Sequence, residues 1–243
     1  MEEVASWEPQ ISKLSVGEIL QWSSRTFGHD LVFATSLGLE DQLVAQVIAD
    51  LRLNIDIVTL DTGRLYEETQ TLIDQTQNQL GLKIRVITPE HESLEKHLSE
   101  WGPLGFRQSV TARRACCAVR KVMPLRRALA GKRAWITGLR RDMSPWRSDV
   151  RVVAHDHSFD GIKIAPLWDW TRPMVESWVA DRGTPVHPLH AQGYLSIGCA
   201  PCTRPVAEGD DERSGRWWWE RHEQSECGLH WHEGRVLANP LVR

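Results

Sequence analysis

Residues 31–60 read LVFATSLGLEDQLVAQVIADLRLNIDIVTL, and this stretch decides the fold. It opens with a short apolar run, Leu31–Thr35, and closes with a second one, Ile55–Leu60. Between them, apolar residues recur every three or four positions. Short apolar runs are typical of buried strands, and the three- to four-residue spacing is typical of an amphipathic helix. The stretch therefore predicts a strand, a helix and a second strand, the repeating unit of a parallel sheet.

The same alternation continues along the chain. A helix is expected from about residue 64 to Leu80, and Gly81 is a plausible C-cap. A strand follows at Lys83–Thr88, then a helix over residues 116–130 and a strand over residues 134–138. Strands separated by helical segments predict an α/β fold with a doubly wound, mostly parallel sheet.

The second half contains a hairpin and then loses its periodicity. Val150–Ala154 and Lys163–Ala165 flank the turn signal Asp160-Gly161. Thr171 is the predicted N-cap of a helix that reaches about residue 181. Beyond this helix Pro, Gly and Trp dominate. The sequence thus predicts one α/β domain over residues 1–204 and an irregular C-terminal segment over residues 205–243.

Length and composition restrict the class of protein. A chain of 243 residues with 41% hydrophobic residues suits one domain with a large core. No run of about 18 apolar residues would span a membrane, and no basic start followed by an apolar block marks a secretory signal. We therefore expect a cytoplasmic protein that does not contact a membrane.

The charge is unevenly distributed. The net charge is −3, yet residues 107–151 contain 13 Lys and Arg against two acids, Asp142 and Asp149, an excess of +11. A solvated basic face is one reading. An anionic ligand is the other: a nucleotide, a sulfate or phosphate, or RNA. Acidic residues elsewhere argue against unspecific binding to long nucleic acid.

Three polar loops follow predicted strands, at residues 35–38, 61–64 and 137–141. In a parallel sheet, ligands bind at the carboxyl ends of the strands, and a loop glycine lets backbone N–H groups approach a phosphate. The loops therefore predict a nucleotide pocket. No Walker-type Gly-Lys-Ser/Thr is present, and no lysine follows the first loop, which argues against ATP cleavage. The pocket residues expected from these loops are Ser36, Gly38, Thr62, Gly63, Arg64 and Arg140.

Four of the five cysteines form two pairs, Cys116-Cys117 and Cys199-Ala-Pro-Cys202. Adjacent residues on a helix point about 100° apart, so a tandem pair reaches one small ion only with local distortion. A larger iron–sulfur cube presents several metal corners, and neighbouring thiolates could each take one. We favour a [4Fe–4S] cluster. A zinc site and unrelated buried thiols remain as alternatives.

The fifth cysteine, Cys227, stands apart in the sequence ECGLH, in a predicted exposed loop. A thiol becomes a nucleophile when cationic groups lower its pKa. The candidate groups are His230, Arg213 and Arg216. The alternative is a lone, unreactive cysteine.

Seven stretches then match a known family. They are LDTGRLYEET from Leu60, CCAVRKVMPL from Cys116, AWITGLRRDMSPWR from Ala134, KIAPLWDWT from Lys163, GYLSIGCAPCTRPV from Gly193, DERSGRWWWE from Asp211 and ECGLH from Glu226. Over residues 31–230 the chain resembles the bacterial assimilatory adenylyl-sulfate reductases, the iron–sulfur branch of the phosphoadenylyl/adenylyl-sulfate reductases. The resemblance implies a fold of the adenine-nucleotide alpha-hydrolase-like (PP-loop) type.

The resemblance also implies a reaction. Adenosine 5′-phosphosulfate (APS) would be reduced to sulfite and AMP in sulfate assimilation and cysteine biosynthesis, with thioredoxin or glutaredoxin as reductant. Cys227 matches the nucleophile, which would carry an S-sulfonate intermediate. Lys121, Arg213 and Arg216 match residues that contact substrate, and His230 is a possible modulator of the thiol. The residues that match the ligands of a [4Fe–4S] cluster are Cys116, Cys117, Cys199 and Cys202.

Elementary electrostatics agrees with these roles. Anionic oxygens shield the sulfur of a sulfate group, so a thiolate is repelled unless cations neutralise that charge. Lys121 lies about one helical turn after Cys117, which predicts a cluster beside the substrate lysine. A ligated C-x-x-C pair cannot pass electrons as a dithiol, which favours a structural or electrostatic role for the cluster.

Three other functions compete with this one. A reductase of the 3′-phosphorylated nucleotide (PAPS) is the nearest, although that branch generally lacks the cluster cysteines, and the acids Glu40 and Asp41 should disfavour an extra phosphate. A tRNA-thiolating PP-loop enzyme would also combine a cluster with a basic surface. A zinc-bound RNA-binding module is the non-enzymatic alternative. A homo-oligomer is possible in each case.

Overall fold

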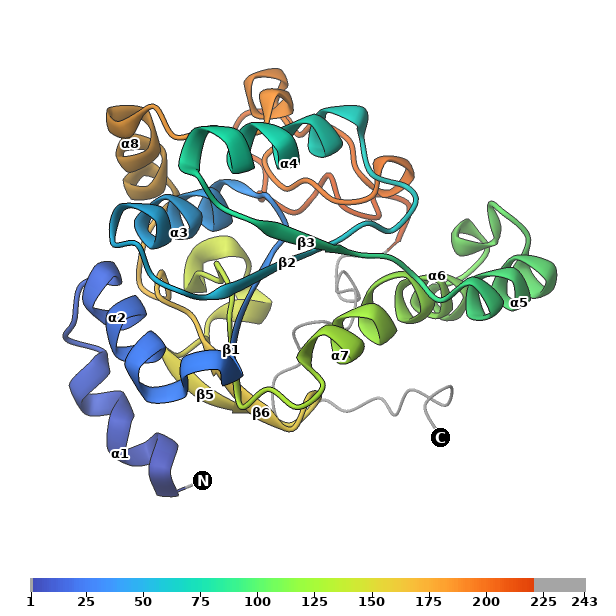
Figure 1. The fold of residues 1–243 in the computed structure, drawn as a ribbon. Helices are drawn as coiled ribbons and strands as arrows, with labels where there is room; N and C mark the ends of the chain where they lie inside the picture. Colours follow the sequence, from blue (N-terminus) through green and yellow to red (C-terminus); the bar gives the residue numbers. More distant parts are fainter. Residues whose placement is uncertain (1, 221–243) are drawn as a thin grey trace.

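The computed structural model of this protein describes residues 2–220, and a six-stranded sheet lies at its centre (Figure 1). The sheet order is β3-β2-β1-β4-β6-β5, with β5 antiparallel to β6 and all other pairs parallel. The strands are β1 (Leu31–Thr35), β2 (Asp56–Leu60), β3 (Ile84–Ile87), β4 (Ala134–Ile136), β5 (Val153–Asp156) and β6 (Gly161–Ile164). The predicted doubly wound, mostly parallel sheet is confirmed.

Eight α-helices accompany the sheet within the described residues. They are α1 (Glu2–Ile11), α2 (Val16–Phe27), α3 (Leu39–Asp50), α4 (Glu67–Leu80), α5 (His91–Trp101), α6 (Val110–Cys117), α7 (Met123–Leu129) and α8 (Arg172–Arg182). Helices α2, α3, α4 and α8 share one apolar core with the sheet, and α7 packs on the opposite face. Helix α5 projects away from the sheet (Figure 1).

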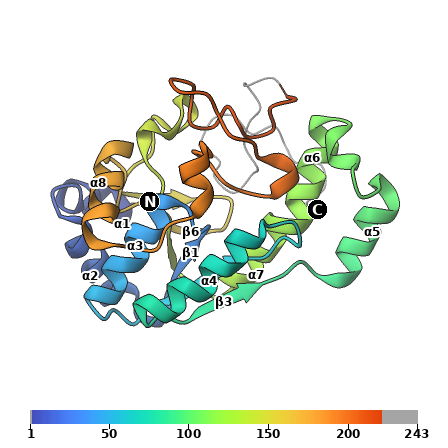
Figure 2. The same cartoon turned by 90° about the horizontal axis from the view of Figure 1, so that it is seen from above.

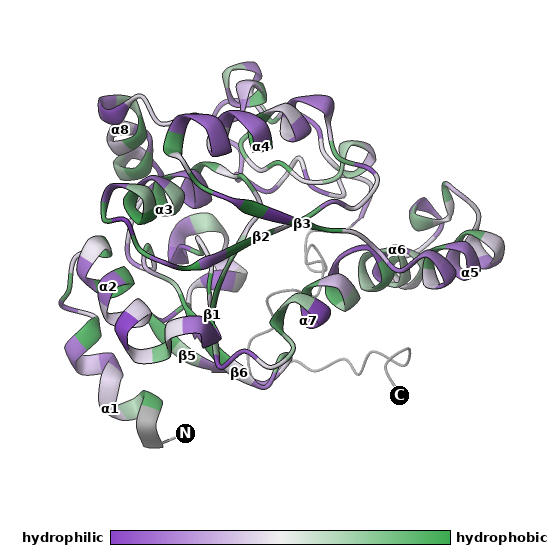
Figure 3. Ribbon diagram, viewed as in Figure 1, coloured by the Kyte–Doolittle hydropathy of each residue, from purple (hydrophilic) through white to green (hydrophobic). Residues whose placement is uncertain are grey.

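Alternation along β1 explains the two cores. Leu31 and Phe33 point to the larger core, and Val32 points to the smaller one beneath α7. Successive side chains of a strand lie on opposite faces, so a strand buried on both sides is apolar throughout. In Figure 3, β1 is mainly hydrophobic, whereas much of α4 and α5 is hydrophilic.

The helix predicted over residues 116–130 differs from the observed one. It begins earlier, at Val110, where the Ser109 side chain accepts a hydrogen bond from the Ala112 N–H. Directly after the tandem cysteines it changes to a π-helical segment, Ala118–Val122, before α7 continues. The sequence pattern predicts one helix here and does not show where the turn widens.

Other boundaries carry smaller corrections. Thr171 occupies the N-cap of α8, but its side chain makes no capping hydrogen bond. The Asp142 carboxylate accepts from the Arg172 N–H instead, at 3.2 Å. Helices α1, α2 and α5 were not predicted. Within the described residues, no helix is both long and apolar enough to cross a bilayer.

Residues 205–220 are joined closely to the part that precedes them. Thr203 and Arg216 form an antiparallel bridge, and the Trp217 N–H donates to the Cys202 carbonyl at 3.2 Å. This segment turns back over the ends of the strands and passes beside α6 (Figure 2). A domain boundary near residue 204 remains a prediction, but the chain is continuous in structure across it.

Candidate active site

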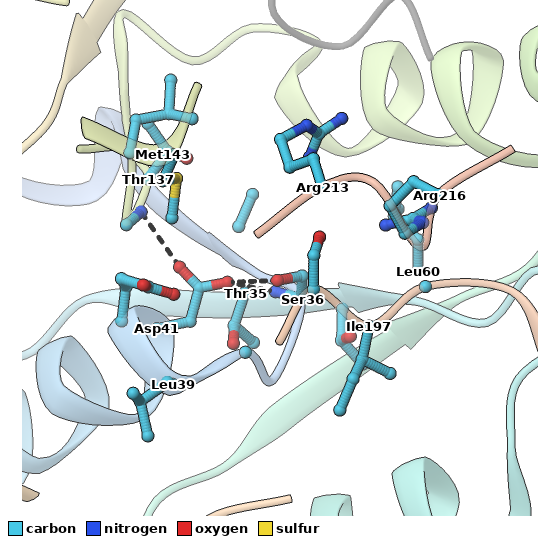
Figure 4. A pocket seen from close by; sticks show the side chains of 18 of the residues that line it. Thr35, Ser36, Leu39, Asp41, Leu60, Thr137, Met143, Ile197, Arg213 and Arg216 are labelled. Carbon is cyan, nitrogen blue, oxygen red and sulfur yellow. Dashed lines mark hydrogen bonds between the residues drawn. The ribbon is translucent and has the colours of Figure 1, made fainter. Parts of the chain in front are cut away.

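The main cavity opens at the carboxyl ends of β1, β2 and β4 and has a volume of about 190 Å³. Parallel strands bring their following loops to this edge, as the sequence predicts. The expected site residues that line this cavity are Ser36, Gly38, Thr62, Lys121, Arg213 and Arg216. In Figure 4 the two arginines lie across the cavity from Ser36 and Asp41.

The Asp41 carboxylate connects the first and third polar loops beside the main cavity. Its carboxylate accepts hydrogen bonds from the Ser36 N–H and hydroxyl at 2.6 and 2.7 Å, and from the Gly138 N–H at 2.9 Å (Figure 4). Burial raises the pKa of Asp41 to about 6, although the bonds from Ser36 act in the opposite direction. Gly138 leaves no room for a side chain here, since a Cβ would lie 2.9 Å from the Glu40 Cβ. The first and third polar loops are thus held at a fixed separation.

Four cationic side chains line the main cavity: Lys121, Arg147, Arg213 and Arg216. Lys121 comes from the π-helical segment, and the last two come from the segment that crosses the strand ends. Arg213 and Arg216 share a turn rather than a helix, with the Arg216 N–H donating to the Arg213 carbonyl at 2.8 Å. Both line the same cavity.

Arg147 also lines the main cavity, although its sequence context does not mark it as a site residue. It lies within the matched stretch AWITGLRRDMSPWR and within the basic stretch, but many arginines share that stretch. Its side chain is buried, and Nη1 lies 3.0 Å from the Met143 sulfur. Only the folded loop after β4 distinguishes it from its basic neighbours.

Arg216 is a buried cation that points to an anionic ligand. The residue is 7% exposed, and no carboxylate pairs with its guanidinium among residues 2–220. Its Nε atom has no hydrogen-bond partner in the same part of the chain. The guanidinium lies 4.7 Å from the centroid of the Trp217 ring. Burying a charge without a counter-charge is unfavourable. The Arg216 guanidinium would therefore be stabilised by an anionic ligand in the main cavity.

The four paired cysteines meet in a second, smaller space, the cysteine cavity. It is lined by Cys116, Cys117, Cys199 and Cys202 together with Arg64, Phe106, Arg113, Arg120, Lys121, Arg216 and Trp217. All four cysteines are buried and unpaired by disulfides. Lys121, Arg216 and Trp217 line both cavities, so the thiols lie directly beside the anion site. This confirms the expected proximity of Lys121 and the tandem cysteines.

The cysteine cavity suits a group held by thiolates. Its lining contains four sulfur donors and no carboxylate or imidazole. Soft thiolates select zinc or iron–sulfur clusters. Within the described part of the chain, no group of three or more Cys, His, Asp or Glu side chains is placed to hold a single metal ion. The four sulfur donors in the lining suit a thiolate-held group, either zinc or an iron–sulfur cluster.

The thiols have different acidities. Burial raises the pKa of Cys116 and raises that of Cys202 to about 11. Burial acts in the same direction on Cys199, but the Lys121 ammonium and a 3.3 Å contact with the Thr62 hydroxyl outweigh it and lower the pKa of Cys199. The cationic surroundings thus favour the thiolate form of Cys199.

A π-helical segment directly follows the tandem pair. Cys116 and Cys117 end α6, and Ala118–Val122 follows as a π-helix. A π-helical turn is wider than an α-helical turn and often occurs at functional sites. Lys121 belongs to this segment and lines both cavities.

Three expected pocket residues do not line the main cavity. Arg140 is fully buried and pairs with Glu40 at 2.8 Å, with Glu212 at 3.0 Å and with Asp142. Burial disfavours its charge, but the first two carboxylates outweigh that effect and raise its pKa. Its guanidinium is therefore engaged within the fold, and a direct contact with nucleotide is not supported.

Gly63 and Arg64 lie in the second polar loop, and Arg64 lines the cysteine cavity. Gly63 has a φ of 67°, a left-handed conformation that favours glycine. Arg64 donates to the Pro103 carbonyl and lies 4.8 Å from the centroid of the Phe106 ring. Arg64 thus lines the cysteine cavity, and Gly63 lines neither cavity.

The basic stretch divides in the same way. Lys121 and Arg147 reach the main cavity, whereas Arg113, Arg127 and Arg151 pair with glutamates elsewhere in the fold. Two cations of the basic stretch line the main cavity, but much of the local charge excess is compensated by distant acids. Cys227 and His230 lie outside the described residues.

Comparisons with known proteins agree with this arrangement. A family model described as the phosphoadenosine phosphosulfate reductase domain matches residues 30–205. A protein of Agrobacterium fabrum named adenosine 5′-phosphosulfate reductase is 49% identical over 203 residues, 84% of this chain and 78% of its own length. One of Allochromatium vinosum with the same name is 48% identical over 200 residues, 82% of this chain and 78% of its own.

Solved structures show the same fold. The phosphoadenylyl-sulfate reductase of Candida auris, crystallised with phosphate, has a TM-score of 0.72 at 25% identity and covers 85% of this chain and 97% of its own. The FMN adenylyltransferase of Candida glabrata with ATP has a TM-score of 0.56 at 14% identity over 91% of this chain and 75% of its own, a likeness of fold alone. The expected PP-loop type of fold is confirmed, and the chain belongs to the phosphoadenosine phosphosulfate reductase domain family of enzymes.

Proposed function

We propose that this protein reduces adenosine 5′-phosphosulfate to sulfite and AMP in sulfate assimilation. The observation that carries the proposal is the shared wall of the two cavities. Lys121 and Arg216 line both, so an anion bound beside them lies next to four thiols. The names of the relatives that are 43–50% identical to this chain support the same substrate.

The proposed reaction has two transfers. The Cys227 thiolate attacks the sulfur of the substrate, the sulfur–oxygen bond to the phosphate breaks, and AMP leaves with the bonding electron pair. The sulfonate group then remains on Cys227 as Cys–S–SO₃⁻. A thiolate of thioredoxin or glutaredoxin attacks the Cys227 sulfur, sulfite leaves with the electron pair of the sulfur–sulfur bond, and a second reductant thiol resolves the mixed disulfide.

The cations act where negative charge is concentrated. Lys121, Arg213 and Arg216 would neutralise the sulfate and phosphate oxygens, which lowers the repulsion felt by the incoming thiolate. The loop that contains Ser36 and Gly38 would hold the nucleotide at the strand ends, and Thr62 would border it from β2. His230 could modulate the Cys227 thiol from the same ECGLH sequence.

A [4Fe–4S] cluster held by Cys116, Cys117, Cys199 and Cys202 is part of the proposal. Bound there, the cluster would supply a fixed charge and a rigid link between α6 and the loop that precedes Arg216. We propose a structural or electrostatic role rather than electron transfer. A change in its oxidation state during a single turnover, seen by electron paramagnetic resonance, would contradict that role.

The function is tested by replacing Cys227 with serine. The Cys227→Ser protein should bind substrate and keep its visible thiolate–iron absorbance, yet release no sulfite. Ser225→Ala, two residues away, is the matched control and should release sulfite normally. Sulfite release by the Cys227→Ser protein would contradict the mechanism, and loss of the absorbance would make Cys227 a ligand.

A second candidate function is the reduction of PAPS, which the likeness to the Candida auris reductase favours. The acids expected to repel a 3′-phosphate are both engaged within the fold: Glu40 pairs with Arg140, and Asp41 accepts three hydrogen bonds. Comparing kcat/KM for the two nucleotides separates the candidates. We expect a preference for APS on the strength of the more similar relatives.

The partners complete the proposal. Thioredoxin or glutaredoxin would supply electrons in the cytoplasm, and the protein could form a homo-oligomer. Sulfite formation in the absence of tRNA would exclude the tRNA-thiolating alternative, and a brown colour would exclude a zinc-bound RNA-binding module.

A further inference from the structure

We propose that Gly198 is a positioning residue that sets the location of the Arg216 guanidinium in the anion site. The inference rests on the proposed function, because it assigns Arg216 to the anionic part of the substrate. Gly198 directly precedes Cys199 in the sequence, and it lines the main cavity together with Arg216.

Gly198 and the Arg216 guanidinium approach each other closely. A Cβ at position 198 would lie 2.6 Å from the Arg216 Cζ and 2.7 Å from its Nη1, with Nη2 closer still. Non-bonded heavy atoms settle at about 3.5 Å or more, so the guanidinium would have to move by about 1 Å. The missing side chain of Gly198 is therefore the space that the guanidinium occupies.

Hydrogen bonds to and near Thr203 hold the backbones of Gly198 and Arg216 in place. The Gly198 N–H donates to the Thr203 hydroxyl at 3.2 Å, and that hydroxyl donates to the Cys199 carbonyl at 2.9 Å. Thr203 in turn bridges to Arg216. With both ends held, an added methyl group can be relieved only by the flexible end of the arginine.

An alanine at position 198 should be compatible with the fold. Gly198 does not have a positive φ, so alanine can adopt its backbone conformation without strain. All three atoms that a Cβ would meet belong to one flexible side chain. Gly198→Ala should therefore leave the fold intact and displace only the Arg216 guanidinium. A glycine needed merely for folding would behave in the opposite way.

The test is a double-mutant cycle on substrate affinity. In the Cys227→Ser protein, which should bind without turnover, titration calorimetry measures the Kd of APS for four forms: the parent, Gly198→Ala, Arg216→Ala and the combination. Gly198→Ala should weaken binding on the order of 10- to 100-fold, because a charge-assisted contact is lost. In the Arg216→Ala background the same change should weaken it less than about twofold, since coupled residues are not additive.

The control is Gly17→Ala, whose Cβ would meet only the ends of Leu51 and Val47 at 3.3 and 3.9 Å. It should leave the Kd unchanged. The visible absorbance and the Tm of Gly198→Ala should match those of the parent. Equal losses from Gly198→Ala in both backgrounds, or loss of its absorbance, would overturn the positioning role alone. Failure of the parent to bind APS would refute the proposed function, and this inference with it.

Discussion

Replacing Arg140 with methionine should destabilise the fold rather than weaken substrate binding selectively. The Arg140 side chain is fully buried and joins three carboxylates from different parts of the chain. Methionine retains most of the apolar volume but removes the positive charge and the hydrogen bonds. Two carboxylates, those of Glu40 and Glu212, would then be left in poorly solvated surroundings without a cation.

The expected magnitude follows from the exposure of the partners. The Glu40 and Glu212 side chains are 10% and 18% exposed, so solvent replaces the lost cation poorly, whereas Asp142 at 41% is well solvated. Removing one member of a buried ion pair costs about 3–5 kcal/mol. We expect a loss of that order in the free energy of unfolding at neutral pH, or roughly 10 °C in Tm for a chain of this size.

The stability lost in Arg140→Met should depend on pH. Burial already raises the pKa of Glu212, while Arg140 counteracts that shift. Without Arg140 the pKa of the folded form rises further above its unfolded value, and the folded variant then takes up protons more readily than the unfolded one. The difference in stability between wild type and variant should therefore shrink as the pH falls below neutral.

Urea unfolding followed by tryptophan fluorescence measures the effect, together with the KM for APS. Arg126→Met is the control, because Arg126 is an exposed arginine of the same basic stretch, and it should change stability by no more than about 0.5 kcal/mol. A loss below about 1 kcal/mol in Arg140→Met, combined with a large rise in KM, would refute the argument and restore Arg140 as a nucleotide contact.

Two further predictions concern the loops and the cluster. The pKa of Asp41 is raised to about 6 from 3.8, so its folded form binds more protons than its unfolded form between these values, and its contribution to stability falls as the pH rises through that window. The free energy of unfolding of wild type minus that of Asp41→Asn should therefore decrease from about pH 4 to 6; a pH-independent difference would show that Asp41 does not titrate there. Cys202→Ser should lose most of its bound iron and visible absorbance because it removes one thiol of the cysteine cavity; iron content equal to that of wild type would contradict the proposed ligand set.

The sequence by itself determined the sheet and the residue types that line the site. Apolar runs such as Leu31–Thr35 mark strands wherever a strand is buried on both faces, and the loops that follow must then meet at one edge. Residue types also carry chemical information without a structure, since paired cysteines suit a thiolate-held group wherever they lie. The motif matches extended this to a family, and the comparisons confirmed the family.

Only the tertiary structure decided which cations are available to a ligand. Arg140 and Lys121 belong to the same basic stretch, yet one meets carboxylates from Glu40 and Glu212 while the other lines two cavities. Their partners lie far away in the sequence, so local pattern cannot separate them. The π-helical segment after Cys117 was likewise not predicted from the sequence.

The relation between Gly198 and Arg216 shows the limit most clearly. A glycine before a C-x-x-C pair reads as a simple turn, and an arginine in a motif reads as a ligand contact. Their dependence on each other appears only when the bridge between Thr203 and Arg216 lays one backbone against the other. Residue type determines what a side chain can bind, and long-range packing determines whether that side chain is free to bind it.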